Sequence, residues 1–323
     1  MKSFYKLSLL LTVLSLLTLP QAACGGQPAS TSGGEMEGTI AVSGAWALYP
    51  MMTRWAEEFQ KLHPKVQFDV SAGGAGKGMA DALAGAVDIG MVSRDITPEE
   101  EGKGAFWVAV TKDAVFPTIN AQNPVLQDLL KKGVTRQQFI DLYINGTIKT
   151  WGELVGRPEI TDEIHLFTRS DAAGAPETWA KYLGMKQEDL LGVAVFGDPG
   201  VMDAVIKDPL GIGFNNLGYA YDLTSGKPVE GAAILPIDYN ENGQADPDEV
   251  LETMAEAIEM VATDKYPSPP ARALNLVTNG KSTNPIVLAF LQWILTDGQQ
   301  FVGEAGYVKL PQEQLDAGLQ KLK

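Results

Sequence analysis

The chain has little of the chemistry on which most enzymes depend. Its 323 residues include one cysteine, Cys24, and two histidines, His63 and His165. A single cysteine cannot form an internal disulfide, so the fold must depend on its apolar core. Neither histidine belongs to a G-x-S-x-G or H-E-x-x-H pattern, the local signatures of a serine hydrolase and of a zinc protease. The sequence therefore predicts a binding protein and not an enzyme.

Positive charge is also scarce. The chain has 25 lysines and arginines against 40 aspartates and glutamates, which gives a net charge of −15. Long-range repulsion therefore opposes the binding of nucleic acid or of an anionic lipid surface. Local capture of a small anion remains compatible with this charge, because backbone N–H groups at helix starts can hold an anion against an unfavourable overall field. We expect no nucleic-acid partner.

Long apolar runs are missing from the chain after residue 24, where no segment approaches the ~20 residues that span a bilayer. The uncharged, Leu-rich stretch of residues 7–19 follows Lys2 and Lys6 and leads through small residues to Cys24. A basic start, a short apolar segment and small residues before a cleavage point are typical of a secretory signal. The sequence therefore predicts a signal peptide over residues 1–23.

Cys24 resembles the first residue of a mature bacterial lipoprotein. Two alanines precede it, and a polar stretch rich in Gly and Ser follows, which predicts a flexible tether over residues 24–37. Gln21 departs from this resemblance, because lipoprotein signals usually have Leu or another apolar residue there. An ordinary cleaved signal with an incidental cysteine is the alternative. We expect a lipid on Cys24, contact with the membrane through that lipid only, and a location in the periplasm or on the outer face of the cell membrane.

Strand and helix patterns alternate along the rest of the chain. Short apolar runs followed by amphipathic segments over short loops are typical of parallel βαβ units. The predicted strands are residues 38–42, 66–70, 87–92, 106–110, 115–120, 164–168, 211–214, 234–237 and 275–277. The predicted helices are residues 50–62, 77–84, 135–143, 151–154, 176–183, 249–262 and 285–295. The fold class is therefore α/β.

Three loops, residues 43–50, 71–78 and 169–176, share one design: a strand ends, Gly or Ala turns the chain, and a helix begins. Helix starts have N–H groups without intrahelical partners and a partly positive dipole end, and small residues let an anion approach them. Each loop alone is more typical of plain α/β packing, but the three together could hold an oxyanion. Residues 73–77 lack the spacing of a Walker loop and of G-x-G-x-x-G, so nucleotide binding is not predicted.

Taken in order, these motifs resemble the phosphate-binding proteins of phosphate ABC transporters. The motifs are Ser43-Gly44-x-x-x-Leu48-x-Pro50, the Gly-rich loop 71–78, Val87 to Arg94, and Arg169-x-Asp171-x-x-Gly174. Further similar segments lie at 144–151, 211–214, 297–300 and 306–311. The resemblance implies a two-lobed periplasmic-binding-protein fold of type II, with mixed sheets, helices on both faces and a hinge of two crossover strands that closes over the ligand. Lobe 1 would comprise residues 38–117 plus 265–323, and lobe 2 residues 118–264.

The predicted ligand loops lack hydroxyl groups that this family uses to bind phosphate oxygens. Ala and Trp replace them in the first loop, Gly73 replaces a Ser in the second, and Ala173 and Ala175 flank Gly174 in the last. A charge-assisted hydrogen bond contributes roughly 1.5–3 kcal/mol, so losing several would weaken phosphate binding by orders of magnitude unless other groups substitute. The ligand therefore stays open between phosphate and a related tetrahedral anion such as molybdate or tungstate.

The predicted ligand set combines these loops with charged side chains. Arg169 would be the main countercharge, since its planar fork matches an oxyanion bidentately. Asp171 would orient Arg169 or accept a proton from the ligand, which would favour hydrogenphosphate over sulfate. Lys77, Arg94 and Ser170 are candidate substitutes for the hydroxyls, with a surface or interlobe ion pair as the alternative for Arg94. The full set is Ala45, Trp46, Ala47, Gly74, Lys77, Ser93, Arg94, Arg169, Ser170, Asp171, Gly174 and Ala175.

A separate motif at residues 238–249 fits the calcium loop D-x-[DN]-x-[DN]-G-x5-E. Its oxygen ligands would be Asp238, Asn240, Asn242, the Gln244 carbonyl and Glu249. The segment before the loop has a strand pattern, so a full helix–loop–helix pair is not predicted, and an acidic Asn/Gly turn is the alternative. We expect no required cofactor and, at most, a structural Ca²⁺.

The chain is therefore expected to be an exported, monomeric solute-binding lipoprotein that carries phosphate or a related tetrahedral oxyanion to the membrane permease of an ABC importer. The alternative is a sensor lipoprotein of the same fold that binds another anion and takes no part in phosphate transport.

Overall fold

The computed structural model describes residues 36–323, and the predicted signal peptide and Cys24 lie outside the described residues. The strands are β1 (Glu37–Gly44), β2 (Lys65–Ala72), β3 (Ile89–Val92), β4 (Ala105–Asn120), β5 (Val134–Thr135), β6 (His165–Arg169), β7 (Val193–Val195), β8 (Gly211–Asn216), β9 (Ala232–Ile234), β10 (Ile237–Asp238) and β11 (Ala271–Asn279). Within this range, no helix has the length and apolar character needed to cross a membrane.

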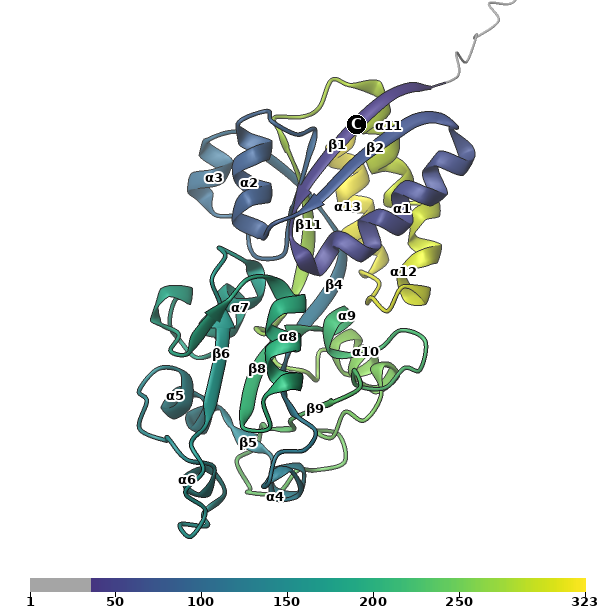
Figure 1. Cartoon of the computed structure of the whole chain (residues 1–323). Helices are drawn as coiled ribbons and strands as arrows, with labels where there is room; N and C mark the ends of the chain where they lie inside the picture. Colours follow the sequence, from purple (N-terminus) through teal and green to yellow (C-terminus); the bar gives the residue numbers. More distant parts are fainter. Residues whose placement is uncertain (1–35) are drawn as a thin grey trace, which may run out of the picture. The chain divides into compact units, whose positions relative to one another are not determined.

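The helices lie between and after these strands, as Figure 1 shows. They are α1 (Tyr49–Leu62), α2 (Ala75–Leu83), α3 (Pro98–Gly102), α4 (Leu126–Lys132), α5 (Arg136–Tyr143), α6 (Trp151–Val155), α7 (Gly174–Tyr182), α8 (Gly197–Lys207), α9 (Leu217–Ala220), α10 (Met254–Ala262), α11 (Pro285–Ile294), α12 (Gln300–Glu304) and α13 (Gln312–Leu322), with short 3-10 turns at Trp46–Leu48, Gln187–Asp189 and Asp297–Gln299.

Most strands form one mixed sheet in the order β2-β1-β3-β11-β4-β8-β6-β7, with β9 also paired to β4. β1 pairs in parallel with β2 and β3, and β6 pairs in parallel with β7 and β8. β11 runs antiparallel to β3 and β4, and β4 runs antiparallel to β8. The parallel pairs are the βαβ units that the alternating sequence pattern predicts.

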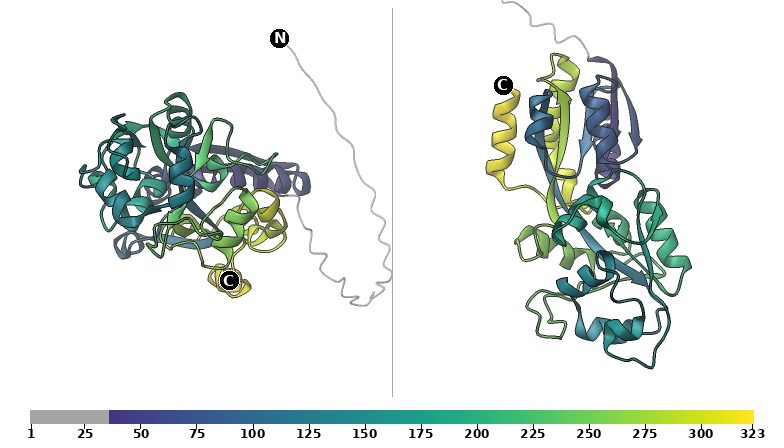
Figure 2. Two further views of the ribbon diagram at one scale, coloured as in Figure 1. Left: turned by 90° about the horizontal axis from the view of Figure 1, so that it is seen from below. Right: turned by 90° about the vertical axis from the view of Figure 1, so that its left-hand side faces the viewer.

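Two buried apolar clusters lie on the two halves of this sheet. The first core gathers side chains of β1, β3, α1, α2, α11 and α13, and the second core gathers side chains of α5, α7, α10 and β8. β4 and β11 contribute to both, since Val108 and Leu274 belong to the first core whereas Val115 and Ala271 belong to the second. Figure 1 shows these two strands running from one group of elements to the other, and Figure 2 shows α13, in yellow, at the edge of the first.

β4 is a single strand of 16 residues, whereas the sequence analysis predicted two strands, 106–110 and 115–120. The polar residues Thr111 to Asp113 lie between these two apolar runs in the sequence. In the structure these residues pair with β11, with Asp113 opposite Arg272. The backbone ladder and an opposite charge therefore keep the strand extended where it passes from one core to the other.

Helix α10 begins at Met254, five residues later than the predicted start at Glu249. Thr253 accepts a hydrogen bond from the Glu256 N–H, and the Glu256 carboxylate accepts one from the Thr253 N–H. This capping box is a stronger start signal than apolar spacing, because it satisfies two N–H donors. Residues 249–252 therefore lie in a loop. Pro236 similarly divides the predicted strand 234–237 into β9 and β10.

Candidate functional site

The second and third predicted loops meet between the two cores. The start of α2 lies against the loop before α7, where the Gly76 N–H donates to the Ala172 carbonyl oxygen over 3.0 Å. Gly74 has a φ of 93°, and a Cβ added there would lie 2.6 Å from the Ala172 carbonyl oxygen. Both the left-handed backbone and the close approach require glycine at position 74.

The start of α7 lies against Ser93, at the end of β3. A Cβ added to Gly174 would lie 2.1 Å from the Ser93 hydroxyl oxygen and 2.3 Å from its carbonyl oxygen. Ser93 is buried, and so are Gly174 and Ala175. The structure therefore brings together three predicted segments that are distant in the sequence, at Gly74, Ser93 and residues 174–175.

The first predicted loop contacts a fourth helix start that the sequence analysis missed. The Trp46 ring packs edge-on against Phe196, with ring centroids 5.9 Å apart, and its Cε2 lies 3.1 Å from a Cβ added to Gly197, the first residue of α8. The Trp46 Nε1–H is buried and has no hydrogen-bond partner in the described chain. Ala45 and Ala47 are buried, and the Ala45 N–H donates to the Met91 carbonyl oxygen.

Arg169, at the end of β6, is the central charged group of this region, and its side chain is 1% exposed. Its Nε and Nη2 donate to the two carboxylate oxygens of Asp171 over 2.7 and 2.6 Å, and its Nη1 donates to Asp198 Oδ2 over 2.6 Å. Burial alone would lower the pKa of Arg169, but the two carboxylates outweigh it and raise that pKa. Arg169 is therefore a fixed positive charge.

Asp171 contacts Arg169 through both carboxylate oxygens, as a residue that orients the Arg169 guanidinium would. Besides Arg169, its Oδ1 accepts the Gly197 N–H over 3.2 Å. Burial alone would raise the pKa of Asp171, but Arg169 and this N–H hold it below the ordinary value. Asp171 is thus a carboxylate at neutral pH. Its second predicted role, accepting a proton from the ligand, stays a prediction.

Two other predicted residues, Lys77 and Arg94, form ion pairs away from Arg169. The Lys77 ammonium pairs with Asp81 one turn further along α2. The Arg94 guanidinium pairs with Glu100 over 2.7 Å and with Glu177 of α7 over 2.9 Å. The contact with Glu177 links the segment after β3 to a helix of the second core. This is the arrangement expected if Arg94 forms an interlobe ion pair. Ser170 is exposed.

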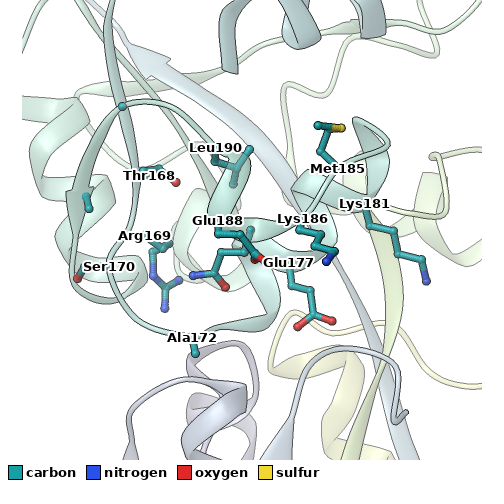
Figure 3. A pocket seen from close by; sticks show the side chains of 13 residues that line it. Thr168, Arg169, Ser170, Ala172, Glu177, Lys181, Met185, Lys186, Glu188 and Leu190 are labelled. Carbon is teal, nitrogen blue, oxygen red and sulfur yellow. The ribbon is translucent and has the colours of Figure 1, made fainter. Parts of the chain in front are cut away.

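A cavity of about 780 Å³ lies beside the loop that follows β6. Figure 3 shows Arg169 and Ser170 on one side of it and Lys181 and Met185 on the other. Gln187 lines this cavity and holds the loop, since its Nε2 donates to the Asp171 carbonyl oxygen over 2.7 Å and its Oε1 accepts the Ala173 N–H over 3.3 Å. Gln187 therefore fixes the loop that bears Asp171.

Four buried polar residues behind Arg169, three of them charged, were not predicted from the sequence: Asp113, Asp198, Asn216 and Arg272. Asp198 is fully buried, and Arg272 is 7% exposed. A lone charge in an apolar strand was the available signal for Arg272, whereas Asp113 follows Lys112 in a polar stretch. Their partners could not be inferred, because they lie 56 to 179 positions away along the chain.

The predicted calcium loop is closed by hydrogen bonds of its own. Asp238 accepts the Asn242 and Gly243 N–H groups, and Glu249 accepts those of Tyr239 and Asp246. The Asn240 and Asn242 amides both donate to Asp246, over 2.7 and 3.0 Å. Residues 36–323 contain no group of three or more His, Cys, Asp or Glu side chains that could hold a metal ion. Calcium binding by Asp238, Asn240, Asn242, Gln244 and Glu249 stays a prediction.

Two apolar cores joined by two strands, with helix starts that converge between them, are typical of the periplasmic-binding-protein class. A family profile described as a PBP superfamily domain matches residues 29–298. The phosphate-binding protein PstS of Bacillus subtilis is 30% identical over 226 residues, which cover 67% of this chain and 72% of that protein. PstS of Methanocaldococcus jannaschii is 27% identical over 376 residues, covering 97% of this chain and 92% of that protein. The chain belongs to the PstS family of phosphate-binding proteins.

Solved structures agree in fold. A substrate-binding protein from Clostridium perfringens, solved with bound phosphate, has a TM-score of 0.70 at 24% identity. The superposition covers 85% of this chain and 100% of that protein's chain. An ABC-type phosphate transport receptor from Vibrio cholerae has a TM-score of 0.60 at 18% identity, covering 84% of this chain and 100% of that one. The predicted mixed α/β fold of a periplasmic binding protein is confirmed.

Proposed function

We propose that this chain binds phosphate between its two cores and delivers it to the membrane subunits of an ABC importer. Family membership supports a binding role without catalysis, and the relatives named PstS support phosphate as the ligand. The observation that carries the proposal is the convergence of helix starts from both cores around Arg169, a buried cation held by two carboxylates.

Arg169 and the helix starts supply complementary donors for such a ligand. A guanidinium has five N–H donors, and the three bonds to Asp171 and Asp198 leave one on Nη1 and one on Nη2. Apart from the Gly76 N–H, which donates to Ala172, the first N–H groups of α2 and α7 would be free to donate to a ligand because they have no intrahelical partner, and the small residues at these starts let an anion approach them. The unpartnered Trp46 Nε1–H is a further donor at the same interface. These groups would replace the missing hydroxyls.

The two cores would be two lobes that close over the ligand. We assign residues 38–117 plus 265–323 to lobe 1 and residues 118–264 to lobe 2. The two clusters separate a few residues from these bounds, between Val110 and Ala114 on β4 and between Ala271 and Leu274 on β11. β4 and β11 would form the hinge. The Arg94–Glu177 pair and the Lys181–Asp95 pair, at 2.9 and 2.5 Å, would favour the closed arrangement.

The protein would act outside the cytoplasm as a monomer, held to the membrane by a lipid on Cys24. The basic start, the apolar stretch and the alanines before Cys24 support this location. Labelling of the expressed protein with a fatty-acid analogue would test the anchor. Label that persists in a Cys24→Ser variant would contradict it.

Calorimetric titration of ligand-free protein with phosphate, sulfate, molybdate and tungstate tests the proposed ligand. We expect saturable heat with phosphate. The Ala and Gly residues in the ligand loops favour molybdate or tungstate as the second candidate, since a larger oxyanion would fill the space that the hydroxyls leave. Heat with one of these anions and none with phosphate would overturn the assignment.

A further inference from the structure

A continuous chain of buried polar groups runs from Arg169 to the strands that join the two cores. Asp198 accepts the Arg169 Nη1–H with Oδ2, and with Oδ1 it accepts the N–H and the side-chain amide of Asn216 over 3.1 and 2.8 Å. Asp198 is 0% exposed and Asn216 is 2% exposed. A shift of Asn216 therefore displaces the carboxylate that orients Arg169, because neither group can exchange its partner for water.

Arg272 of β11 continues this chain across the two cores. Its Nη2 donates to the Asn216 side-chain oxygen, and its Nε donates to the Ser93 carbonyl oxygen over 3.1 Å. Asn216 ends β8 of the second core, whereas Ser93 follows β3 of the first core and lies against Gly174. One guanidinium thus holds a group from each side of the candidate site.

Asp113 of β4 balances the charge of Arg272. Its Oδ2 lies 3.4 Å from Arg272 Nη1, and its Oδ1 accepts the N–H groups of Ala114 and Leu217 over 2.8 and 3.2 Å. A buried cation without this partner would carry a large desolvation penalty. Asp113 and Arg272 lie opposite each other on the two strands that join the cores, so the pair fixes Arg272 at the point where the cores would pivot.

We propose that Arg272, acting through Asn216 and Asp198, is a positioning residue for phosphate capture. It orients the Arg169 guanidinium and ties it to Ser93, so that a bound ligand and the closed arrangement stabilise each other. This inference rests on the proposed function, because it assigns how the phosphate site is held and not which anion fills it.

The substitution Asn216→Ala breaks the chain at its middle and leaves both arginines in place. Asn120→Ala is the matched control, since Asn120 is also buried, at 3% exposed, and its amide donates to the Val205 and Ile206 carbonyl oxygens away from Arg169. We expect Asn216→Ala to raise the phosphate Kd about tenfold. It should also reduce the decrease in radius of gyration on phosphate addition, measured by small-angle scattering. Asn120→Ala should lower the melting temperature and leave both quantities unchanged.

A second variant, Arg272→Gln combined with Asp113→Asn, removes both hinge charges so that neither is left buried alone. We expect a similar loss of affinity in this folded variant, and little further loss when Asn216→Ala is added, because all three changes interrupt one chain. Wild-type affinity in Asn216→Ala, or fully additive losses, would overturn the positioning role while leaving phosphate binding intact. Failure of the wild-type protein to bind phosphate would instead overturn the proposed function, and the inference with it.

Discussion

At the scale of single residues, Trp46 lies in a loop where the family resemblance implies hydroxyl groups, and we propose that its indole N–H is a ligand donor in their place. Its indole N–H is buried without a partner, and its ring contacts Phe196 and Gly197 across the candidate site. An unpartnered buried donor costs about 1–3 kcal/mol, so such a group is retained more readily where a ligand satisfies it.

Trp46→Phe removes this N–H while keeping an aromatic ring. We expect the phosphate Kd to rise at least about tenfold, since a hydrogen bond to a charged oxyanion contributes about 1.5–3 kcal/mol. Trp151→Phe is the matched control, because the Trp151 Nε1–H is also buried without a partner but lies in the second core. Calorimetry on both variants checks the expectation. Equal affinities would show that the Trp46 N–H does not reach the ligand.

Asp113 predicts a pH dependence of stability. Burial raises its pKa to about 6 from an ordinary value of 3.8. At a pH between 3.8 and about 6, Asp113 is protonated in the folded state but ionised in the unfolded state. Protonation of Asp113 therefore raises the free energy of unfolding at low pH, and this contribution is lost as the pH rises through about 6. Wild type should therefore lose about 1 kcal/mol relative to Asp113→Asn between about pH 5 and pH 7. Urea unfolding of both proteins measures this, and parallel pH profiles would contradict it.

At the scale of elements, the starts of α2, α7 and α8 form the candidate site because each lacks a side chain where it meets its neighbour. Gly174→Ala would place a Cβ 2.1 Å from the Ser93 hydroxyl oxygen, so the first turn of α7 would have to move away. We expect at least tenfold weaker phosphate binding, since the close approach of the two cores would be lost.

Gly303→Ala is the control for this substitution. Gly303 lies within α12, and an added Cβ there meets nothing within 4 Å. Alanine should raise the melting temperature slightly at that position, because it has the higher helix propensity, and should leave affinity unchanged. An unaltered phosphate Kd in Gly174→Ala would mean that the contact between α7 and Ser93 is not needed for binding.

Elements were also the level at which the sequence was most informative. Alternating strands and helices predicted the parallel pairs, and Gly74, Arg169 and Gly174 could be named because each belongs to a motif of consecutive residues. Asp198, Asn216 and Arg272 could not, because their meaning depends on long-range contacts made by the folded chain. The length of β4 was missed for the same reason, since its polar middle is extended only beside β11.

At the scale of the whole molecule, polar contacts link the two cores at the candidate site. Arg169 ends β6 on the side of the second core, and Ser93 follows β3 on the side of the first. Arg272, on β11, contacts Ser93 directly and is linked to Arg169 through Asn216 and Asp198. A phosphate that contacts helix starts on both sides would therefore be bound most tightly when the cores are closed.

The most direct test is calorimetric titration of the wild-type protein and Arg169→Lys with phosphate. Lysine keeps a positive charge for Asp198 but loses the planar fork that would hold the ligand. Arg157→Lys, at an exposed ion pair with Asp128 and Glu159, is the matched control. We predict that wild type and Arg157→Lys bind one phosphate per chain with equal affinity, and that Arg169→Lys binds at least about tenfold more weakly. Equal binding by all three proteins, or no binding by wild type, would contradict the account.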